Sequence, residues 1–169
     1  MKILVLSDLH GRIDRAERAL SLHSDADEIL FLGDGIREFS LLMEKKGRPW
    51  IGVLGNCDLF SRMGMGDTVP EERMLCLGGM KILMLHGHRV GVKHGIGGAM
   101  AYADARGADI LLYGHTHVAE EHCFPEGEGR PRSLWVMNPG SIGEPRGGSP
   151  SYGLIQIRNG SVLLSHGAV

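Results

Sequence analysis

The side chains that suggest chemistry stand in short clusters, each directly after a run of apolar residues. The clusters begin at Asp8, Asp34, Asn56, His86, His115 and Asn138. Neighbouring clusters begin between 22 residues (Asp34 to Asn56) and 30 residues (Asn56 to His86) apart, which leaves room for one strand and its return crossover. The carboxyl ends of such strands meet at one edge of a sheet, where open α/β sheets bind their ligands. We therefore expect the clusters to form one site.

The pooled clusters combine carboxylates, an amide oxygen and imidazoles, which together suit Mn, Fe, Zn or Ni better than Ca or Mg. The candidate donors are Asp8, His10, Asp34, Asn56, His86, His88, His115 and His117. This set exceeds the four to six or so ligands that one ion needs, so we predict two adjacent divalent ions that share a carboxylate. Such a pair clamps the two oxygens of a phosphoryl displacement and lowers the pKa of bound water toward about 7.

The apolar runs around these clusters predict an α/β protein. Strands are expected at residues 3–6, 28–32, 50–54, 73–77, 80–85, 109–113, 119–124, 133–137, 152–157 and 161–165. Helical spacing is found at residues 13–23, 37–46 and 96–106, and residues 59–71 are expected to form an irregular loop. Parallel crossovers come first and antiparallel strands follow. We therefore predict a β-sandwich of two mixed sheets flanked by helices.

Composition excludes several classes of protein. The 169 residues predict a single domain over 1–169, and the formal charge of -2 without a basic block does not favour nucleic-acid binding. No apolar stretch is long enough to span a membrane or to form a signal peptide. The three cysteines lack paired spacing, which favours a reducing, cytoplasmic location. Cys57 lies in a polar cluster, whereas Cys76 and Cys123 are expected to be small core residues.

Five motifs in order resemble those of the calcineurin-like metallophosphoesterases. They are Asp8-Leu9-His10, Gly33-Asp34, Gly55-Asn56-Cys57-Asp58, His86-Gly87-His88 and Gly114-His115-Thr116-His117. The small size, the cysteine in the third motif and the later stretches at 138–141, 145–148 and 151–153 are similar to the YfcE-type phosphodiesterase branch. The resemblance runs from about residue 3 to residue 157. It implies the two-sheet sandwich, a dinuclear metal site and phosphodiester hydrolysis.

The resemblance also implies which residues hold which ion. One ion would take Asp8, His10, Asp34 and His117, and the other would take Asp34, Asn56, His86 and His115. Asp34 would bridge the ions, a bridging hydroxide would attack phosphorus, and Asn56 would help to hold the phosphoryl oxygens. Manganese is the favoured metal, with nickel, iron or zinc as alternatives.

Cys57 departs from the wider superfamily, where most members have a histidine thought to protonate the leaving alkoxide. A neutral thiol donates only weak hydrogen bonds. The sequence therefore predicts a preference for good leaving groups, or a proton donor elsewhere, such as His88. The role of His88 stays open between metal ligand, substrate contact and support of the ligands. Asp58 is expected to be structural.

Several functions remain in competition. The expected activity is metal-dependent hydrolysis of a small phosphodiester or nucleotide-like substrate. The alternative enzymatic activity is that of a phosphomonoesterase or nucleotide pyrophosphatase at the same site. A protein-binding scaffold, as in the retromer subunit of this fold, is less favoured because every ligand position is filled. A homodimer or homotetramer is expected. The remaining histidines are expected at the surface: His23, His94, His122 and His166.

Overall fold

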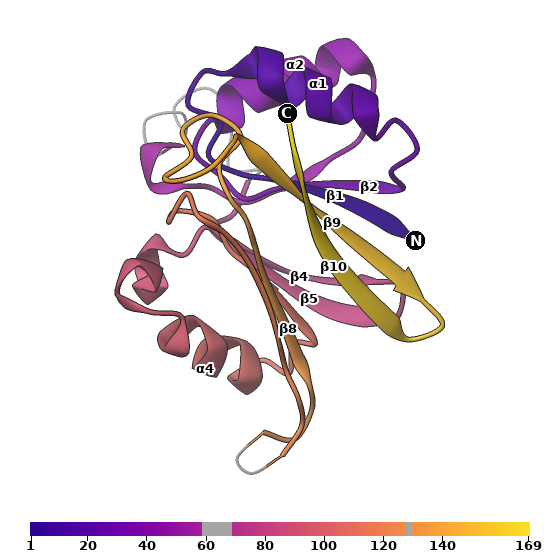
Figure 1. Ribbon diagram of the computed structural model, residues 1–169, viewed down its shortest axis with the longest axis vertical. Helices are drawn as coiled ribbons and strands as arrows, with labels where there is room; N and C mark the ends of the chain where they lie inside the picture. The colour runs from indigo at the N-terminus through magenta and orange to yellow at the C-terminus, as the bar shows by residue number, and fades with distance from the viewer. Residues whose placement is uncertain (59–68, 128–129) are drawn as a thin grey trace.

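Two five-stranded sheets pack face to face and carry helices on their outer surfaces (Figure 1). The computed structural model describes residues 1–58, 69–127 and 130–169. The first sheet has the order β10-β9-β1-β2-β3 and the second the order β4-β5-β6-β8-β7. Helices α1 and α2 lie on the first sheet, and α4 lies on the second (Figure 1). The predicted two-sheet α/β sandwich is confirmed.

The first sheet draws its strands from both ends of the chain. Its members are β1 (Lys2–Leu6), β2 (Glu28–Phe31), β3 (Ile51–Gly52), β9 (Ser151–Arg158) and β10 (Ser161–Ala168). Strands β1, β2 and β3 run parallel, while β9 pairs antiparallel with both β1 and β10. The crossovers are made by α1 (Ile13–Leu22) and α2 (Ile36–Lys46).

The second sheet contains the middle of the chain. Its members are β4 (Glu72–Leu77), β5 (Met80–Leu85), β6 (Ile110–Leu112), β7 (Ala119–Phe124) and β8 (Leu134–Pro139). Strands β5, β6 and β8 run parallel, and the edge strands β4 and β7 pair antiparallel with their neighbours. Three short 3₁₀ turns, η1 (Asn56–Asp58), η2 (His88–Val90) and η3 (Val92–His94), precede α4 (Gly97–Ala105).

The alternation of side chains along the strands builds three apolar layers. In β1, Leu4 and Leu6 pack under α1 and α2, while Ile3 and Val5 point between the sheets. In β5, residues 82 and 84 point between the sheets and residues 83 and 85 pack against α4. Because both faces of each sheet are covered, the central strands are continuously apolar. This explains why they appear in the sequence as unbroken apolar runs.

Most predicted elements are present, with small changes at their ends. The strand expected at 50–54 shortens to Ile51–Gly52, and the strand expected at 133–137 extends to Pro139. The loop expected at 59–71 falls largely outside the described residues. No helix in the described ranges combines the length and apolar character that a membrane crossing requires.

Two expectations about side-chain burial are wrong. Cys76 and Cys123 are exposed, because they lie on the edge strands β4 and β7. His23 is half-buried against the ring of Tyr152, and both of its ring nitrogens are shielded from solvent. His166 is also half-buried, since its ring contacts the main-chain carbonyl of residue 138 at 2.8 Å.

Candidate metal centre

The clusters predicted from the sequence meet at one edge of the sandwich. They follow the carboxyl ends of the three parallel strands of each sheet, β1, β2 and β3 in one and β5, β6 and β8 in the other. Asp8, Asp34 and Asn56 come from the first sheet, whereas His86 and His115 come from the second. Side chains from both sheets therefore face each other across the same space.

The backbone turns sharply at these residues. Five of the candidate ligands have left-handed φ angles: Asp8 (54°), His10 (42°), Asp34 (60°), His115 (69°) and His117 (61°). Among the described residues, one further non-glycine residue has a left-handed φ angle, namely Asn159 in the turn between β9 and β10. A left-handed conformation costs about 1 to 3 kcal/mol for a non-glycine residue and persists where surrounding contacts enforce it. The chain is thus strained where its candidate ligands converge.

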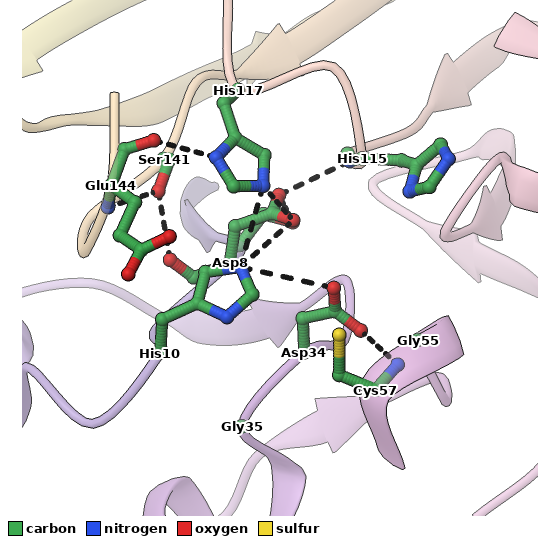
Figure 2. Close-up of polar contacts among 12 residues, drawn as sticks. Asp8, His10, Asp34, Gly35, Gly55, Cys57, His115, His117, Ser141 and Glu144 are labelled. Carbon is green, nitrogen blue, oxygen red and sulfur yellow. Dashed lines mark hydrogen bonds and ion pairs between the residues drawn. The ribbon is translucent and has the colours of Figure 1, made fainter. Parts of the chain in front are cut away.

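The first group of donor atoms comprises Asp8, His10 and His117 (Figure 2). The Nε2 atom of His117 lies 3.2 Å from Asp8 Oδ1 and 3.3 Å from the Nε2 atom of His10. Two nitrogens bound to one ion at about 2.1 Å stand about 3.0 to 3.4 Å apart at octahedral or tetrahedral angles. The two imidazoles therefore already have the spacing of ligands to a shared cation.

The second group of donor atoms comprises Asp8, Asp34 and His86, with Asn56 beside it. The Nε2 atom of His86 lies 3.4 Å from Asp34 Oδ2, 3.9 Å from Asp8 Oδ1 and 3.1 Å from Asn56 Oδ1. Asp34 also lies 3.8 Å from His10 Nε2. It therefore reaches both groups, which is the position expected of a bridging carboxylate.

Main-chain carbonyls orient two of the histidines. The Nδ1–H of His86 donates to the carbonyl of Leu32 at 2.7 Å, and the Nδ1–H of His117 donates to the carbonyl of Glu144 at 2.5 Å (Figure 2). In each ring the Nε2 atom is the one turned toward the carboxylates. Metal-binding histidines are commonly fixed in this way, with the outer nitrogen donating to a carbonyl or carboxylate.

The environment of the Asp8 carboxylate shows whether these residues fit a cation. Its side chain is fully buried, and Oδ2 accepts hydrogen bonds from the hydroxyl of Ser7 at 2.6 Å and from the main-chain N–H of His115 at 3.1 Å. Oδ1 is buried and receives no hydrogen bond from the described residues. A buried carboxylate oxygen without a donor is costly, and a metal ion at Oδ1 would remove that cost. The donor set fits a divalent cation.

The histidines and carboxylates also shift each other's pKa values. Burial opposes ionisation of Asp34, but its contacts with His86 and with the main-chain N–H of Cys57 outweigh burial and hold the pKa of Asp34 below its usual value. Burial disfavours the charged ring of His86, yet Asp34 and Asp8 raise the pKa of His86. Contact with Asp8 raises the pKa of His117. In the metal-free protein, the two carboxylates therefore favour the protonated form of both rings.

Cys57 forms a third group with His10 and Asp34, in which the donor atoms lie within 4.8 Å of one another. Its main-chain N–H donates to Asp34 Oδ1 at 2.8 Å (Figure 2). Burial and the nearby carboxylates, Asp34 foremost, raise the pKa of the thiol to about 11. The side chain is therefore a neutral thiol near pH 7 in the metal-free protein.

Two predicted histidines lie to one side of the close groups. The ring of His115 packs edge-on against the ring of His86, with centroids 5.0 Å apart, and neither His115 nor His88 belongs to the three close groups found among the described residues. Burial, with His86 and Lys93 adding to it, lowers the pKa of His115 to about 4. The ring of His88 lies 5.5 Å from that of His86 and 6.0 Å from that of His115.

Asp58 is structural, as predicted. Its buried carboxylate accepts hydrogen bonds from the main-chain N–H groups of Asp34 (2.7 Å), Gly35 (2.8 Å), Ile36 (3.0 Å) and Gly55 (2.8 Å). It caps the first turn of α2, where the helix has unpaired donors, and ties that turn to the segment after β3. The position of Asp34 depends on this carboxylate.

Glycines in the motifs allow the chain to approach the carboxylates. A Cβ atom at Gly55 would lie 2.1 Å from Asp34 Oδ1, and one at Gly114 would lie 2.1 Å from the hydroxyl oxygen of Ser7. A larger residue at Gly55 would displace the carboxylate of Asp34. One at Gly114 would displace the hydroxyl of Ser7, which donates to Asp8. These two glycines are therefore part of the site.

The stretch from Asn138, at the end of β8, to Glu144 supports the site, as expected of a structural turn near it. The hydroxyl of Ser141 donates to the main-chain carbonyl of Asp8 at 2.8 Å and accepts from the N–H of Glu144 at 2.7 Å. Asn138 donates to the carbonyl of Gly114 at 3.0 Å. The cluster that begins at residue 138 therefore fixes the chain around the ligands. Its place at the end of an apolar run indicated that it lies near the site, whereas the groups that it contacts depend on the tertiary structure.

Known proteins resemble the chain over nearly its full length. A family model described as the calcineurin-like phosphoesterase superfamily domain matches residues 1–160. The probable metallophosphoesterase YsnB of Bacillus subtilis is 31% identical over 166 residues, covering 97% of this chain and 89% of YsnB. The phosphodiesterase YfcE of Escherichia coli K12 is 29% identical over 177 residues, covering 92% and 87%. A predicted phosphoesterase structure from Streptococcus pneumoniae superposes with a TM-score of 0.75 at 28% identity, covering 98% and 87%.

Proposed function

Given that the chain belongs to the calcineurin-like phosphoesterase superfamily, we propose that it hydrolyses phosphodiesters at a centre of two divalent metal ions. The observation that carries the proposal is the buried Oδ1 of Asp8, which receives no hydrogen bond from the described residues although imidazole nitrogens of both sheets lie 3.2–3.9 Å away. Manganese is the favoured ion, with nickel, iron or zinc as alternatives, because the donors mix carboxylate, amide and imidazole.

Each ion would have its own set of ligands. Asp8, His10, Asp34 and His117 would hold one, and Asp34, Asn56, His86 and His115 would hold the other. When bound, the ions supply a water of lowered pKa and neutralise charge on the phosphoryl oxygens. The ligand nitrogens of His86 and His117 would have to be deprotonated, so metal binding would release any proton that they carry.

The protein's own groups have distinct tasks in this reaction. Asn56, which is half-buried beside His86, is placed to donate its amide N–H to a phosphoryl oxygen. Asp34 holds the Cys57 main chain in place through a 2.8 Å hydrogen bond. Asp58 accepts hydrogen bonds from the main-chain N–H groups of Asp34 and Gly55, so it ties together the two segments that carry Asp34 and Asn56.

Proton donation to the leaving group is the weak step. The thiol of Cys57 donates poorly, and its raised pKa of about 11 makes it a weaker acid than the usual thiol. Substrates whose alcohol leaves without a strong acid are therefore favoured. His88, at the rim beside His86 and His115, is the alternative donor. The name of the similar YfcE, a phosphodiesterase, supports the diester over the monoester.

Hydrolysis of two chromogenic esters tests the proposal. Metal-stripped protein is assayed with bis(p-nitrophenyl) phosphate and with p-nitrophenyl phosphate, before and after addition of Mn²⁺. We expect turnover that requires the metal and strongly prefers the diester. Preference for the monoester would overturn the diesterase in favour of a phosphatase. No turnover of either ester, with metal demonstrably bound, would favour a scaffold role.

A further inference from the structure

A pocket of about 460 Å³ opens next to the candidate metal centre. His86 and His88 form the wall that it shares with the centre. The pocket is also lined by Glu71, by Glu72 at the start of β4, and by Tyr102 on α4. Pockets of this size typically bind small organic ligands. Because His86 borders both spaces, a group attached to a phosphate at the metal centre can extend into this pocket.

The charges in the pocket are balanced by ion pairs. Arg89 pairs with Glu71, and Arg106 pairs with Glu72 at 2.9 Å. The hydroxyl of Tyr102 donates to Glu72 at 2.6 Å, and the Arg106 guanidinium lies 3.6 Å from the centre of the Tyr102 ring. Among the described lining residues, Arg89 is the single lysine or arginine. The described lining residues therefore offer carboxylate oxygens and an aromatic ring, and none of them is a lysine or arginine outside an ion pair.

The remaining wall is apolar. Leu85, which is 5% exposed, and the half-buried Val90 line the pocket near His86. A carboxylate that already accepts from an arginine and a tyrosine keeps free lone pairs for further donors. An occupant thus meets apolar surface, one aromatic ring and hydrogen-bond acceptors. The apolar surface and the ring match a flat heterocycle, and the acceptors match a sugar with free hydroxyls.

We propose that this pocket binds one ester group of the substrate, and that this group is an uncharged nucleoside. The inference rests on the proposed diester hydrolysis and names its substrate class. The base packs against Tyr102 and the apolar wall, and the sugar hydroxyls or exocyclic amines donate to Glu72. A second phosphate in the same place finds both arginines already paired with Glu71 and Glu72, which disfavours nucleotide pyrophosphates as substrates.

Three p-nitrophenyl diesters with one leaving group test this assignment. The second ester group is methyl, thymidine 5′-yl, or thymidine 5′-yl with a 3′-phosphate, and kcat/KM is measured with Mn²⁺. We expect the thymidine ester to exceed the methyl ester by at least about tenfold, a ratio that corresponds to about 1.4 kcal/mol. The added 3′-phosphate should remove most of that gain, and the change should appear mainly in KM.

Variants locate the preference in the pocket. Tyr102→Ala should lower the ratio of thymidine ester to methyl ester toward one, and Tyr102→Phe, which keeps the ring, should retain most of it. Glu72→Gln removes a negative charge and releases Arg106, so the penalty for the 3′-phosphate should shrink. Leu22→Ala, at an exposed helical position on α1, is the matched control and should leave the ratios unchanged.

The outcomes separate this inference from the proposed function. If wild-type protein with bound Mn²⁺ hydrolyses none of the three diesters, the proposed function fails. If it hydrolyses all three with equal kcat/KM, or if Tyr102→Ala lowers all three equally, the nucleoside pocket is wrong while the diesterase stands.

Discussion

Asp8 has one satisfied and one unsatisfied carboxylate oxygen, which makes it the most informative single residue. Asp8→Asn keeps an oxygen for Ser7 and the His115 main chain but directs an amide N–H where Oδ1 stood. We expect Mn²⁺ affinity to fall at least about a hundredfold, because loss of a ligand should cost no less than loss of a supporting contact. Titration calorimetry of the folded variant measures this, with Asp14→Asn, an exposed carboxylate on α1, as the control. Unchanged affinity would exclude Asp8 as a ligand.

Cys57 allows a prediction about reactivity. At pH 8 a thiol with a pKa of about 11 is about 0.1% ionised, whereas one at the reference value of 9.0 is about 10% ionised. Alkylation requires the thiolate, so folded, metal-free protein should react at Cys57 about a hundredfold more slowly than the same chain unfolded in urea. A variant with Cys76→Ser and Cys123→Ser isolates the signal, and mass spectrometry follows it. Equal rates in the two states would contradict the raised pKa.

At the scale of elements, Asp58 joins the start of α2 to the segment after β3. Asp58→Ala leaves four main-chain N–H groups without their acceptor. Leaving buried donors unsatisfied costs about 1 to 3 kcal/mol each when they cannot reach water, so we expect a total loss of about 2 to 4 kcal/mol after relaxation. Urea unfolding measures the loss. Metal affinity should fall as well, because Asp34 N–H is one of the four donors.

The same comparison needs a surface control. Asp25→Ala removes an exposed aspartate that pairs with Lys2 and should change the free energy of unfolding much less than Asp58→Ala does. If Asp58→Ala were no more destabilising than Asp25→Ala, the cap would not hold α2 in place.

His23 links the end of α1 to β9 and makes stability depend on pH. Burial, with Lys2 adding to it, lowers the pKa of His23 below 6.5, so the folded state favours the neutral ring. The stability that this ring contributes is complete above about pH 6.5 and is lost as pH falls through the lowered pKa. Metal-free wild-type protein should therefore lose stability between pH 6.5 and 5 more steeply than His23→Gln. Urea unfolding across this range tests it, with the exposed His94→Gln as control; identical slopes would refute it.

The ends of the elements show how far sequence can predict this site. Each candidate ligand follows a strand that its apolar run predicts, so the convergence of the clusters was foreseeable. The left-handed backbone at Asp8, His10 and Asp34 was not, because aspartate and histidine prefer other conformations unless tertiary contacts enforce this one. The burial of His23 against Tyr152 likewise depends on a partner 129 positions later (23 to 152).

At the scale of the whole molecule, the candidate ligands connect the two sheets. Those from the first sheet include Asp8 and Asp34, and those from the second include His86 and His117. We propose that residues 1–169 form one domain that unfolds as a unit. Mn²⁺ should then raise its stability without splitting the transition, by about 2.7 kcal/mol when free metal is a hundred times the Kd.

Calorimetry with Mn²⁺ and with EDTA checks this prediction, and Asp8→Asn should respond much less to the metal. Two separate transitions in EDTA would show that the sheets are independent units. The expected dimer or tetramer is tested by light scattering on the same samples, and a monomer alone would contradict it.

The position of β1 has a consequence for synthesis of the protein. This strand lies between β2, made soon afterwards, and β9, which spans Ser151–Arg158. A nascent chain on the ribosome therefore carries Ile3–Leu6 with one hydrogen-bonding edge open until β9 emerges. Long-range pairing of this kind folds slowly, and an open apolar edge invites association with other chains. Newly made copies are accordingly the ones that most need chaperones, whereas the finished sandwich has closed that edge.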